Sequence, residues 1–194
     1  MNRRGVLAGL FAVGCPKAPC GAVVRDAQIE GPYYLGLGTV RQDITEGRGG
    51  LPVQLDLTVV DAQCTPLEGV QVDLWHADAD GVYSGYAEEG TEGETWMRGR
   101  QTTDARGEVR FTTILPGLYV GRTAHYHLRL EAQGFSPFVT QVYFSGDIHQ
   151  RIREEYNVRN GTGNDEDGYY RADHRLDVRE GRKGFTATGI IELR

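Results

Sequence analysis

Short runs in which apolar and polar residues alternate recur along the chain from residue 51 onwards. In the first run, residues 53–59 alternate between apolar and polar side chains, and this period of two is typical of a half-buried β-strand. Turn-forming segments such as Pro116-Gly117 separate the runs. Short strands joined by turns predict an all-β fold, an antiparallel β-sandwich with long loops and at most one or two short helices. Comparable runs lie at residues 70–74, 109–111, 125–130, 138–144 and 185–193.

Two stretches near the C-terminus lack this alternation. Residues 148–156 are predicted to form a short helix, and the polar, glycine-containing residues 157–184 are predicted to form a long surface loop. Within that loop, residues 164–168 resemble a calcium-binding loop, but the position that requires Glu would be His174. A solvated loop is therefore the preferred interpretation, and both His149 and His174 are expected to be exposed.

The composition agrees with one folded domain. The chain has 194 residues, of which 39% are hydrophobic and 25% charged, and 27 are glycine. This balance argues against a disordered chain, and the excess of glycine fits a turn-rich β protein. Because 27 acidic residues outnumber 21 basic ones, the net charge is −6, and no nucleic-acid partner is expected.

The N-terminal segment differs in kind from the rest of the chain. Two arginines precede an apolar run over residues 6–13, which is shorter than the ~20 residues that a membrane-spanning helix needs. This pattern is typical of a secretory signal, and the glycine directly before Cys15 resembles a bacterial lipoprotein processing site. We therefore expect a leader and linker over residues 1–28 and one domain over residues 29–194. The protein would be exported, as a periplasmic, cell-envelope or secreted protein. An ordinary cleaved signal and a buried terminal segment remain alternatives.

The cysteines add one further expectation about the exported protein. The chain holds three, namely Cys15, Cys20 and Cys64. If Cys15 carries a lipid anchor, Cys20 and Cys64 remain as a candidate disulfide pair in an oxidising compartment. Two unpaired thiols are the alternative.

Histidine and tyrosine residues supply the candidate chemistry. His125 and His127 are two apart in a predicted strand, so their side chains leave the same face ~6.6 Å apart and could bind one metal ion. Tyr119 and Tyr83 each lie in a loop after a predicted strand or turn. Phenolate and imidazole together suit Fe³⁺, and tyrosinate ligation of iron is known in proteins. Hydrogen-bonded histidines and tyrosines that cover the ends of the sandwich are the alternative.

A series of motifs in fixed order makes the interpretation more specific. It includes Glu30-Gly-Pro-Tyr-Tyr-Leu35, Val72-Asp-Leu-Trp-His76, Asp80-Gly-Val-Tyr-Ser84, Arg98-Gly-Arg-Gln101, Phe111-Thr-Thr-Ile-Leu-Pro-Gly-Leu-Tyr119 and Gly121-Arg-Thr-Ala-His-Tyr-His127. In this order the motifs resemble those of the intradiol ring-cleavage dioxygenases, the family of catechol and protocatechuate dioxygenases. The similarity covers roughly residues 28–194 and is strongest to exported, single-domain members.

The resemblance implies a non-haem Fe(III) enzyme that cleaves a catechol-type aromatic with O₂ to a cis,cis-muconate-type product. It implies that Tyr119 also accepts a proton from the substrate, and that Arg122 stabilises negative charge that develops on the ring. Gln141 matches a further active-site residue, and Gly31 and Pro32 match a segment that lines the substrate pocket. The iron ligands implied are Tyr83, Tyr119, His125 and His127.

Several alternatives stay open at the level of sequence. Parts of the pattern also resemble small prealbumin-like β-sandwich modules, which would bind carbohydrate or aromatics on the cell surface without catalysis. An inactive dioxygenase that binds aromatics is a third possibility. Tyr86 competes with Tyr83 as a ligand, although the Asp-Gly-x-Tyr pattern selects Tyr83, and His76 is expected to have a structural role. The acidic loop over residues 86–96 leaves the identity of the catechol open, and a homo-oligomer is compatible with the sequence.

Overall fold

The computed structural model describes residues 21–156 and 162–194. Its regular elements are eight strands, one α-helix and three single-turn 3₁₀ helices within that part of the chain. The strands are β1 (Pro52–Val60), β2 (Gln71–Trp75), β3 (Arg98–Thr102), β4 (Glu108–Ile114), β5 (His125–Glu131), β6 (Phe138–Tyr143), β7 (Asp177–Gly181) and β8 (Gly184–Glu192). The helices are α1 (Gly146–Glu155), η1 (Ala87–Glu89), η2 (Asn164–Glu166) and η3 (Ala172–His174).

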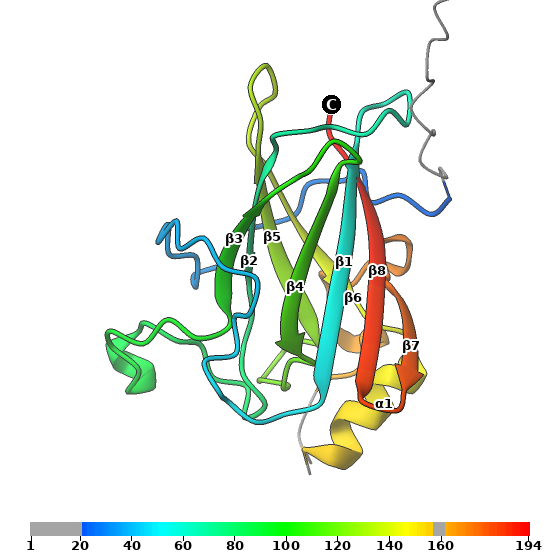
Figure 1. The fold of residues 1–194 in the computed structure, drawn as a ribbon. Coiled ribbons are helices and arrows are strands. Elements are labelled where there is room, and N and C mark those ends of the chain that lie inside the picture. The colour runs from blue at the N-terminus through cyan, green and yellow to red at the C-terminus, as the bar shows by residue number, and fades with distance from the viewer. Residues whose placement is uncertain (1–20, 157–161) are drawn as a thin grey trace, which may run out of the picture.

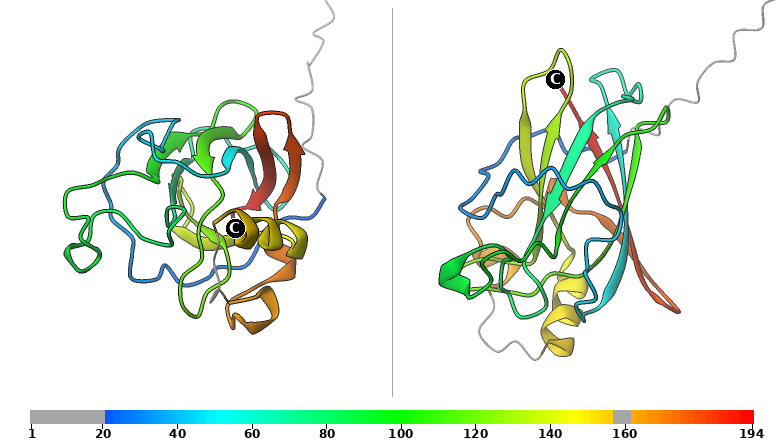
Figure 2. Two further views of the ribbon diagram at one scale, coloured as in Figure 1. Left: turned by 90° about the horizontal axis from the view of Figure 1, so that it is seen from below. Right: turned by 60° about the vertical axis from the view of Figure 1, so that its left-hand side comes forward.

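The strands form two sheets that pack face to face, as Figures 1 and 2 show. One sheet has the order β4-β1-β8-β7 and the other the order β3-β2-β5-β6. The predicted β-sandwich is confirmed. Its pairings are antiparallel except that β8 runs parallel to β1, because the chain returns to the middle of the first sheet after a long connection. The loops that follow β2 and β4 gather with α1 at one end of the sandwich (Figure 1).

The alternating pattern of β5 explains where the core ends and where the candidate site begins. Tyr126, Leu128 and Leu130 belong to the apolar cluster between the sheets, and each such buried side chain stabilises the fold by roughly 1.5–3 kcal/mol. Because successive residues of a strand face opposite sides, His125 and His127 lie on the outer face of the second sheet. Both are nevertheless 2% exposed, so other segments must cover that face.

The N-terminal segment supplies much of this cover. The backbone N–H of Gln28 donates to the carbonyl of Val139 at 2.9 Å, and that of Arg41 donates to the carbonyl of Arg100 at 3.1 Å. Between these two points, residues 29–40 cross the outer face of the β3-β2-β5-β6 sheet, which is the blue segment of Figure 1. The tertiary structure thus brings residues near the start of the domain to strands that lie far along the chain, from Gln28 to Val139 and from Arg41 to Arg100.

The region predicted as a long surface loop is more ordered than expected. It contains β7, which pairs with β8, and its Leu176 is 5% exposed. The predicted exposure of His149 and His174 is wrong, since they are 6% and 1% exposed. His149 shares the buried face of α1 with two isoleucines, and His174 packs against β6. Polar side chains in these segments can be buried because most of their polar groups find partners after folding. Periodicity along the sequence cannot reveal such partners.

The leader prediction falls largely outside the described residues. Residues 1–20, with Cys15 and Cys20, are among those not described, and the boundary at residue 28 stays a prediction. Val24 is 4% exposed and forms a parallel bridge to Ile191, so the end of the expected linker packs on the domain. Cys64 is disulfide-bonded, and the two other cysteines lie outside the described part. Within residues 21–156 and 162–194, no helix is long and apolar enough to cross a membrane.

Candidate metal centre

The four predicted ligand residues meet at one point on the outer face of the second sheet. The Nε2 atoms of His125 and His127 are 3.1 Å apart, and the Tyr119 hydroxyl lies 3.3 Å from His125 Nε2. The Tyr83 ring stands edge-on to Tyr119, with centroids 5.7 Å apart, and to His127, with centroids 6.3 Å apart. The two tyrosine rings and the two imidazole rings therefore gather at one place, and their binding of a metal ion stays a prediction.

Neighbouring groups fix the orientation of the two histidines. His125 donates its Nδ1–H to the carbonyl of Thr123 at 2.7 Å, and this bond leaves the lone pair of Nε2 directed at the centre. Trp75 of β2 stacks on the His127 ring, with centroids 4.8 Å apart and planes 11° apart. Burial lowers the pKa of His125 to about 3 and holds the pKa of His127 well below its usual value. Both rings are consequently neutral at pH 7, which is the form that binds metal ions.

Two glycines allow the tyrosine-bearing loops to approach each other. Gly81 has a φ of +80°, and a Cβ at this position would overlap the carbonyl oxygen of Leu118, next to Tyr119. The backbone N–H of Gly117 donates to the carbonyl of Asp78 at 2.8 Å, and a Cβ on Gly117 would overlap the same backbone. Glycine at both positions is thus required by the contact that places Tyr83 beside Tyr119.

Tyr83 carries the clearest sign of a missing partner. Its side chain is 2% exposed, and its hydroxyl is buried without a hydrogen-bond partner in the described structure. Burial, reinforced by Tyr119, raises the pKa of Tyr83 well above 10. A buried hydroxyl left unsatisfied costs about 1–3 kcal/mol, and a bound cation would remove this cost by stabilising the phenolate. Tyr86 is different, because its hydroxyl donates to the carbonyl of Pro32 at 3.1 Å.

Arg122 lies beside the centre in a fixed position. Its Nε–H donates to Asp167 at 3.0 Å, and its Nη2–H donates to the side-chain oxygen of Gln141. The amide of Gln141 in turn donates to the carbonyl of Ile29 at 2.9 Å. Burial disfavours the charge of Arg122, but Tyr119 and Asp167 outweigh it, so the pKa of Arg122 is raised. Arg122 therefore places a permanent positive charge beside the centre, held by a buried carboxylate and an amide.

Asp167 is a site residue that the sequence interpretation missed. Its segment was predicted to be a solvated loop, but the Asp167 side chain is 0% exposed and also accepts the backbone N–H of Thr123 at 2.9 Å. The solvated-loop prediction is therefore wrong at this position. No local signal in the sequence separates Asp167 from the acidic residues beside it, because only folding brings it to Arg122.

The N-terminal segment completes the surroundings of the centre. Gly31 adopts a φ of +73°, and a Cβ there would lie 3.4 Å from Cε1 of His127. Gly31 thus borders the His127 ring, and the binding of substrate by Gly31 and Pro32 stays a prediction. Tyr33 stacks on Tyr83, with centroids 4.2 Å apart, and its carbonyl accepts a hydrogen bond from Arg98 at 2.7 Å.

Arg98 and His76 are buried residues that hold neighbouring segments in place. Arg98 is 4% exposed and binds both the hydroxyl and the carbonyl of Ser84, at 2.9 and 2.8 Å, so it holds the residue after Tyr83. The sequence interpretation gave Arg98 no role. His76 contacts the Thr113 hydroxyl at 2.6 Å and the Ala77 carbonyl at 2.7 Å, which agrees with the structural role expected for it.

A β-sandwich on which two tyrosines and two histidines converge defines a candidate non-haem metalloprotein. Comparison with known proteins makes this class specific. Residues 29–152 match the family model described as Dioxygenase. The catechol 1,2-dioxygenase of Acinetobacter baylyi (strain ATCC 33305 / BD413 / ADP1) is 30% identical over 156 residues, which cover 69% of this chain and 50% of that protein. The chain belongs to the intradiol ring-cleavage dioxygenase family, and it spans about half the length of the relatives that it matches in sequence.

Solved structures agree with this family. The intradiol ring-cleavage dioxygenase from Tetranychus urticae superposes with a TM-score of 0.82 at 27% identity, over 88% of this chain and 94% of that one. The dioxygenase domain of a dioxygenase carbohydrate-binding protein fusion from Streptomyces sp. SirexAA-E gives a TM-score of 0.72 at 31% identity, over 87% and 96%. Both of these structures are covered almost completely by this chain.

Proposed function

We propose that the protein is a non-haem Fe(III)-dependent intradiol dioxygenase that cleaves the ring of a catechol-type aromatic to a cis,cis-muconate-type product. The observation that carries the proposal is the convergence of four donors at one point, with the Tyr83 hydroxyl buried and unpaired. Tyr83, Tyr119, His125 and His127 would hold the iron. Two anionic phenolate oxygens with two neutral imidazoles suit the hard Fe³⁺ ion, and the buried hydroxyl and neutral rings fit that group.

Bound Fe(III) would supply Lewis-acid activation of the catechol and the electronic route for its reaction with O₂. Both oxygen atoms enter the product, so catechol and O₂ balance the muconic acid formed without any added reductant. The remaining steps fall to residues of this chain.

Each of these residues has a role that its position allows. Tyr119 is hydrogen-bonded to His125 and would accept a proton from a catechol hydroxyl. Arg122 would stabilise the negative charge that develops on the ring, as a fixed charge that needs no reorganisation. Gln141 would hold the Arg122 guanidinium in place, and Gly31 and Pro32 would border the substrate. The segment that covers His127 would limit the access of water.

The substrate and the location of the protein are part of the same proposal. Relatives are named catechol, chlorocatechol and hydroxyquinol 1,2-dioxygenases, so the substrate would be a catechol with a small ring substituent or none. The signal-like N-terminus supports an exported protein, with Cys15 as a candidate lipid anchor. Family membership favours the enzymatic interpretation over the non-enzymatic β-sandwich module.

Iron content, colour and oxygen uptake together test the proposal. The wild-type protein should contain iron, should absorb visible light through tyrosinate-to-iron charge transfer, and should consume O₂ with at least one catechol of a panel. Tyr119→Phe and His125→Ala should lose most of the iron and reduce oxygen uptake at least 100-fold. Tyr86→Phe is the matched control, because Tyr86 lies close by but bonds to Pro32, and this variant should retain both.

Two results would overturn the proposal. One is a colourless, iron-free protein from iron-replete cells that consumes no O₂ with any catechol. The other is full oxygen uptake by Tyr119→Phe and His125→Ala, because the proposed centre requires both side chains. A non-enzymatic module would show no oxygen uptake in any variant.

A further inference from the structure

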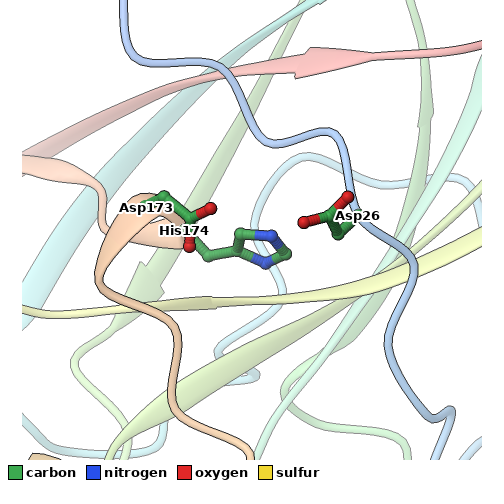
Figure 3. A group of neighbouring side chains, drawn as sticks. All are labelled: Asp26, Asp173 and His174. Atoms are coloured by element: carbon green, nitrogen blue, oxygen red, sulfur yellow. The ribbon is translucent and has the colours of Figure 1, made fainter.

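A second cluster of ligand-type side chains lies away from the candidate metal centre. It forms where the N-terminal segment passes η3 and consists of Asp26, Asp173 and His174 (Figure 3). One imidazole nitrogen and one oxygen of each carboxylate lie within 4.8 Å of one another. The members come from opposite ends of the chain, so folding alone brings them together.

His174 gives evidence for a ligand that is independent of the two carboxylates. Its side chain is 1% exposed. Its Nδ1 atom lies 3.1 Å from the carbonyl oxygen of Gln141 and 3.4 Å from the hydroxyl of Thr140. Because a carbonyl only accepts hydrogen bonds, Nδ1 carries a proton, and in the neutral ring Nε2 then carries the lone pair. Burial lowers the pKa of His174, which favours this neutral form at pH 7.

The lone pair of His174 is directed into the cluster and has no partner. Nε2 is buried without a hydrogen-bond donor among the described residues. Figure 3 shows the ring extended toward Asp26, with one ring nitrogen on the side of that carboxylate. A buried nitrogen lone pair beside two carboxylates is unfavourable, since all three groups are acceptors and none donates. A cation between them would satisfy all three at once.

Arg171 is the existing positive charge of the cluster. Its Nη2 lies 2.6 Å from Asp26 Oδ2 and 3.0 Å from Asp173 Oδ2, and its Nε lies 3.1 Å from Asp173 Oδ1. Arg171 thereby neutralises part of the carboxylate charge, but it does not satisfy the His174 nitrogen. Each carboxylate oxygen has a second lone pair, so a metal ion could bind beside Arg171, with an affinity that Arg171 reduces.

We propose that Asp26, Asp173 and His174 bind a divalent transition-metal ion of the Zn²⁺ type, with water in the remaining position. One imidazole and two carboxylates are ligands that Zn²⁺ accepts. The Nδ1–H bond to a backbone carbonyl is the usual outer partner of a metal-binding histidine. The ion would tie the N-terminal segment, which borders the candidate metal centre through Ile29 and Gly31, to η3. This site is separate from the proposed iron site.

Equilibrium dialysis of the iron-loaded, full-length protein against Zn²⁺ tests the proposal, with both metals measured on each sample. Wild-type protein should bind one Zn²⁺ per chain with its iron content unchanged, and its melting temperature should rise. His174→Ala and Asp26→Ala should lose this Zn²⁺ and the rise. Asp26 is 52% exposed at its side chain, so its variant should fold even if His174→Ala does not.

Matched variants distinguish a metal site from a purely structural ion-pair cluster. His149→Ala is the control, because His149 is also buried but its Nε2 is bonded to the carbonyl of Thr162 at 3.0 Å, and Zn²⁺ binding should persist. Arg171→Ala should bind Zn²⁺ several-fold more tightly, since a competing charge is gone. A purely structural cluster would bind no Zn²⁺ in the wild type or in Arg171→Ala, and that result would overturn the proposal.

The remaining outcomes are also decisive. Zn²⁺ that persists in Asp26→Ala but disappears in His125→Ala would lie in the candidate metal centre, and the proposal would be wrong. Iron is measured on the same samples, so a protein without iron would contradict the proposed dioxygenase function alone. The loss or persistence of Zn²⁺ in Asp26→Ala would still test the second site.

Discussion

At the scale of single residues, Asp167 shows how one buried carboxylate controls the charge beside the centre. Its side chain is fully buried, and it accepts hydrogen bonds from Arg122 and from the backbone of Thr123. Removing one member of a buried ion pair typically costs about 3–5 kcal/mol, because the other charge stays buried without compensation. In the proposed enzyme Asp167 would be a positioning residue, since it would act on the substrate only through Arg122.

Asp167→Asn should therefore lower activity without removing the metal. The amide can still accept the N–H of Thr123 but no longer balances the Arg122 charge. We expect an unchanged iron content, a kcat reduced at least tenfold, and a reduced free energy of unfolding. Asp165→Asn is the matched control, because Asp165 is exposed in the same segment. Equal kinetics for the two variants would show that Arg122 does not depend on Asp167.

At the scale of elements, the two tyrosine-bearing loops act as one unit. The loop after β2 carries Tyr83 and the loop after β4 carries Tyr119, and they touch through Gly81 and Gly117. The strands determine only where each loop starts, and the approach of their backbones determines the distance between the tyrosines. A side chain at either glycine would force the loops apart.

Gly81→Ala tests this contact against a glycine of similar conformation. Gly81 and Gly90 have φ values of +80° and +69°, but a Cβ on Gly90 meets nothing within 4 Å. Both substitutions carry the left-handed backbone cost of roughly 1–2 kcal/mol, and Gly81→Ala adds an overpacking cost of about 1–3 kcal/mol. Urea unfolding should show the larger loss for Gly81→Ala, together with reduced iron binding. Equal losses in the two variants would argue against the contact.

At the scale of the whole molecule, burial of the histidines couples stability to pH. The chain contains five histidines, and all five are buried. Burial lowers the pKa of each, to about 3 for His76 and His125. In the unfolded chain each ring titrates near pH 6.5. The unfolded state therefore binds more protons than the folded state between about pH 6.5 and pH 3.

The free energy of unfolding should consequently fall as the pH is lowered through this window. Each ring contributes up to about 1.4 kcal/mol per pH unit. His76 is the ring to test, because it lies outside the proposed metal ligands. Urea titrations between pH 7 and pH 4 should give a shallower pH dependence for His76→Gln than for the wild type. Parallel curves would mean that His76 is protonated in the folded protein as readily as in the unfolded chain.

Local patterns in the sequence were sufficient for the strands and for part of the site. Alternation predicted most of the sandwich, and it placed His125 and His127 on one face of β5. The order of the motifs identified the family, and with it Tyr83 and Tyr119 as candidate ligands. These features depend on short-range periodicity or on contiguous residues, so they can be read along the chain.

Tertiary structure alone decided the rest. It placed β7 and the buried His174 in a stretch that looks like loop, brought Asp167 to Arg122, and laid the N-terminal segment over His127. It also joined Asp26 to Asp173 and His174 across almost the whole chain. A buried polar side chain is stable only when its partners are present, and those partners come from distant segments. The sequence by itself therefore determined the fold class and the candidate chemistry, and folding decided which charges meet.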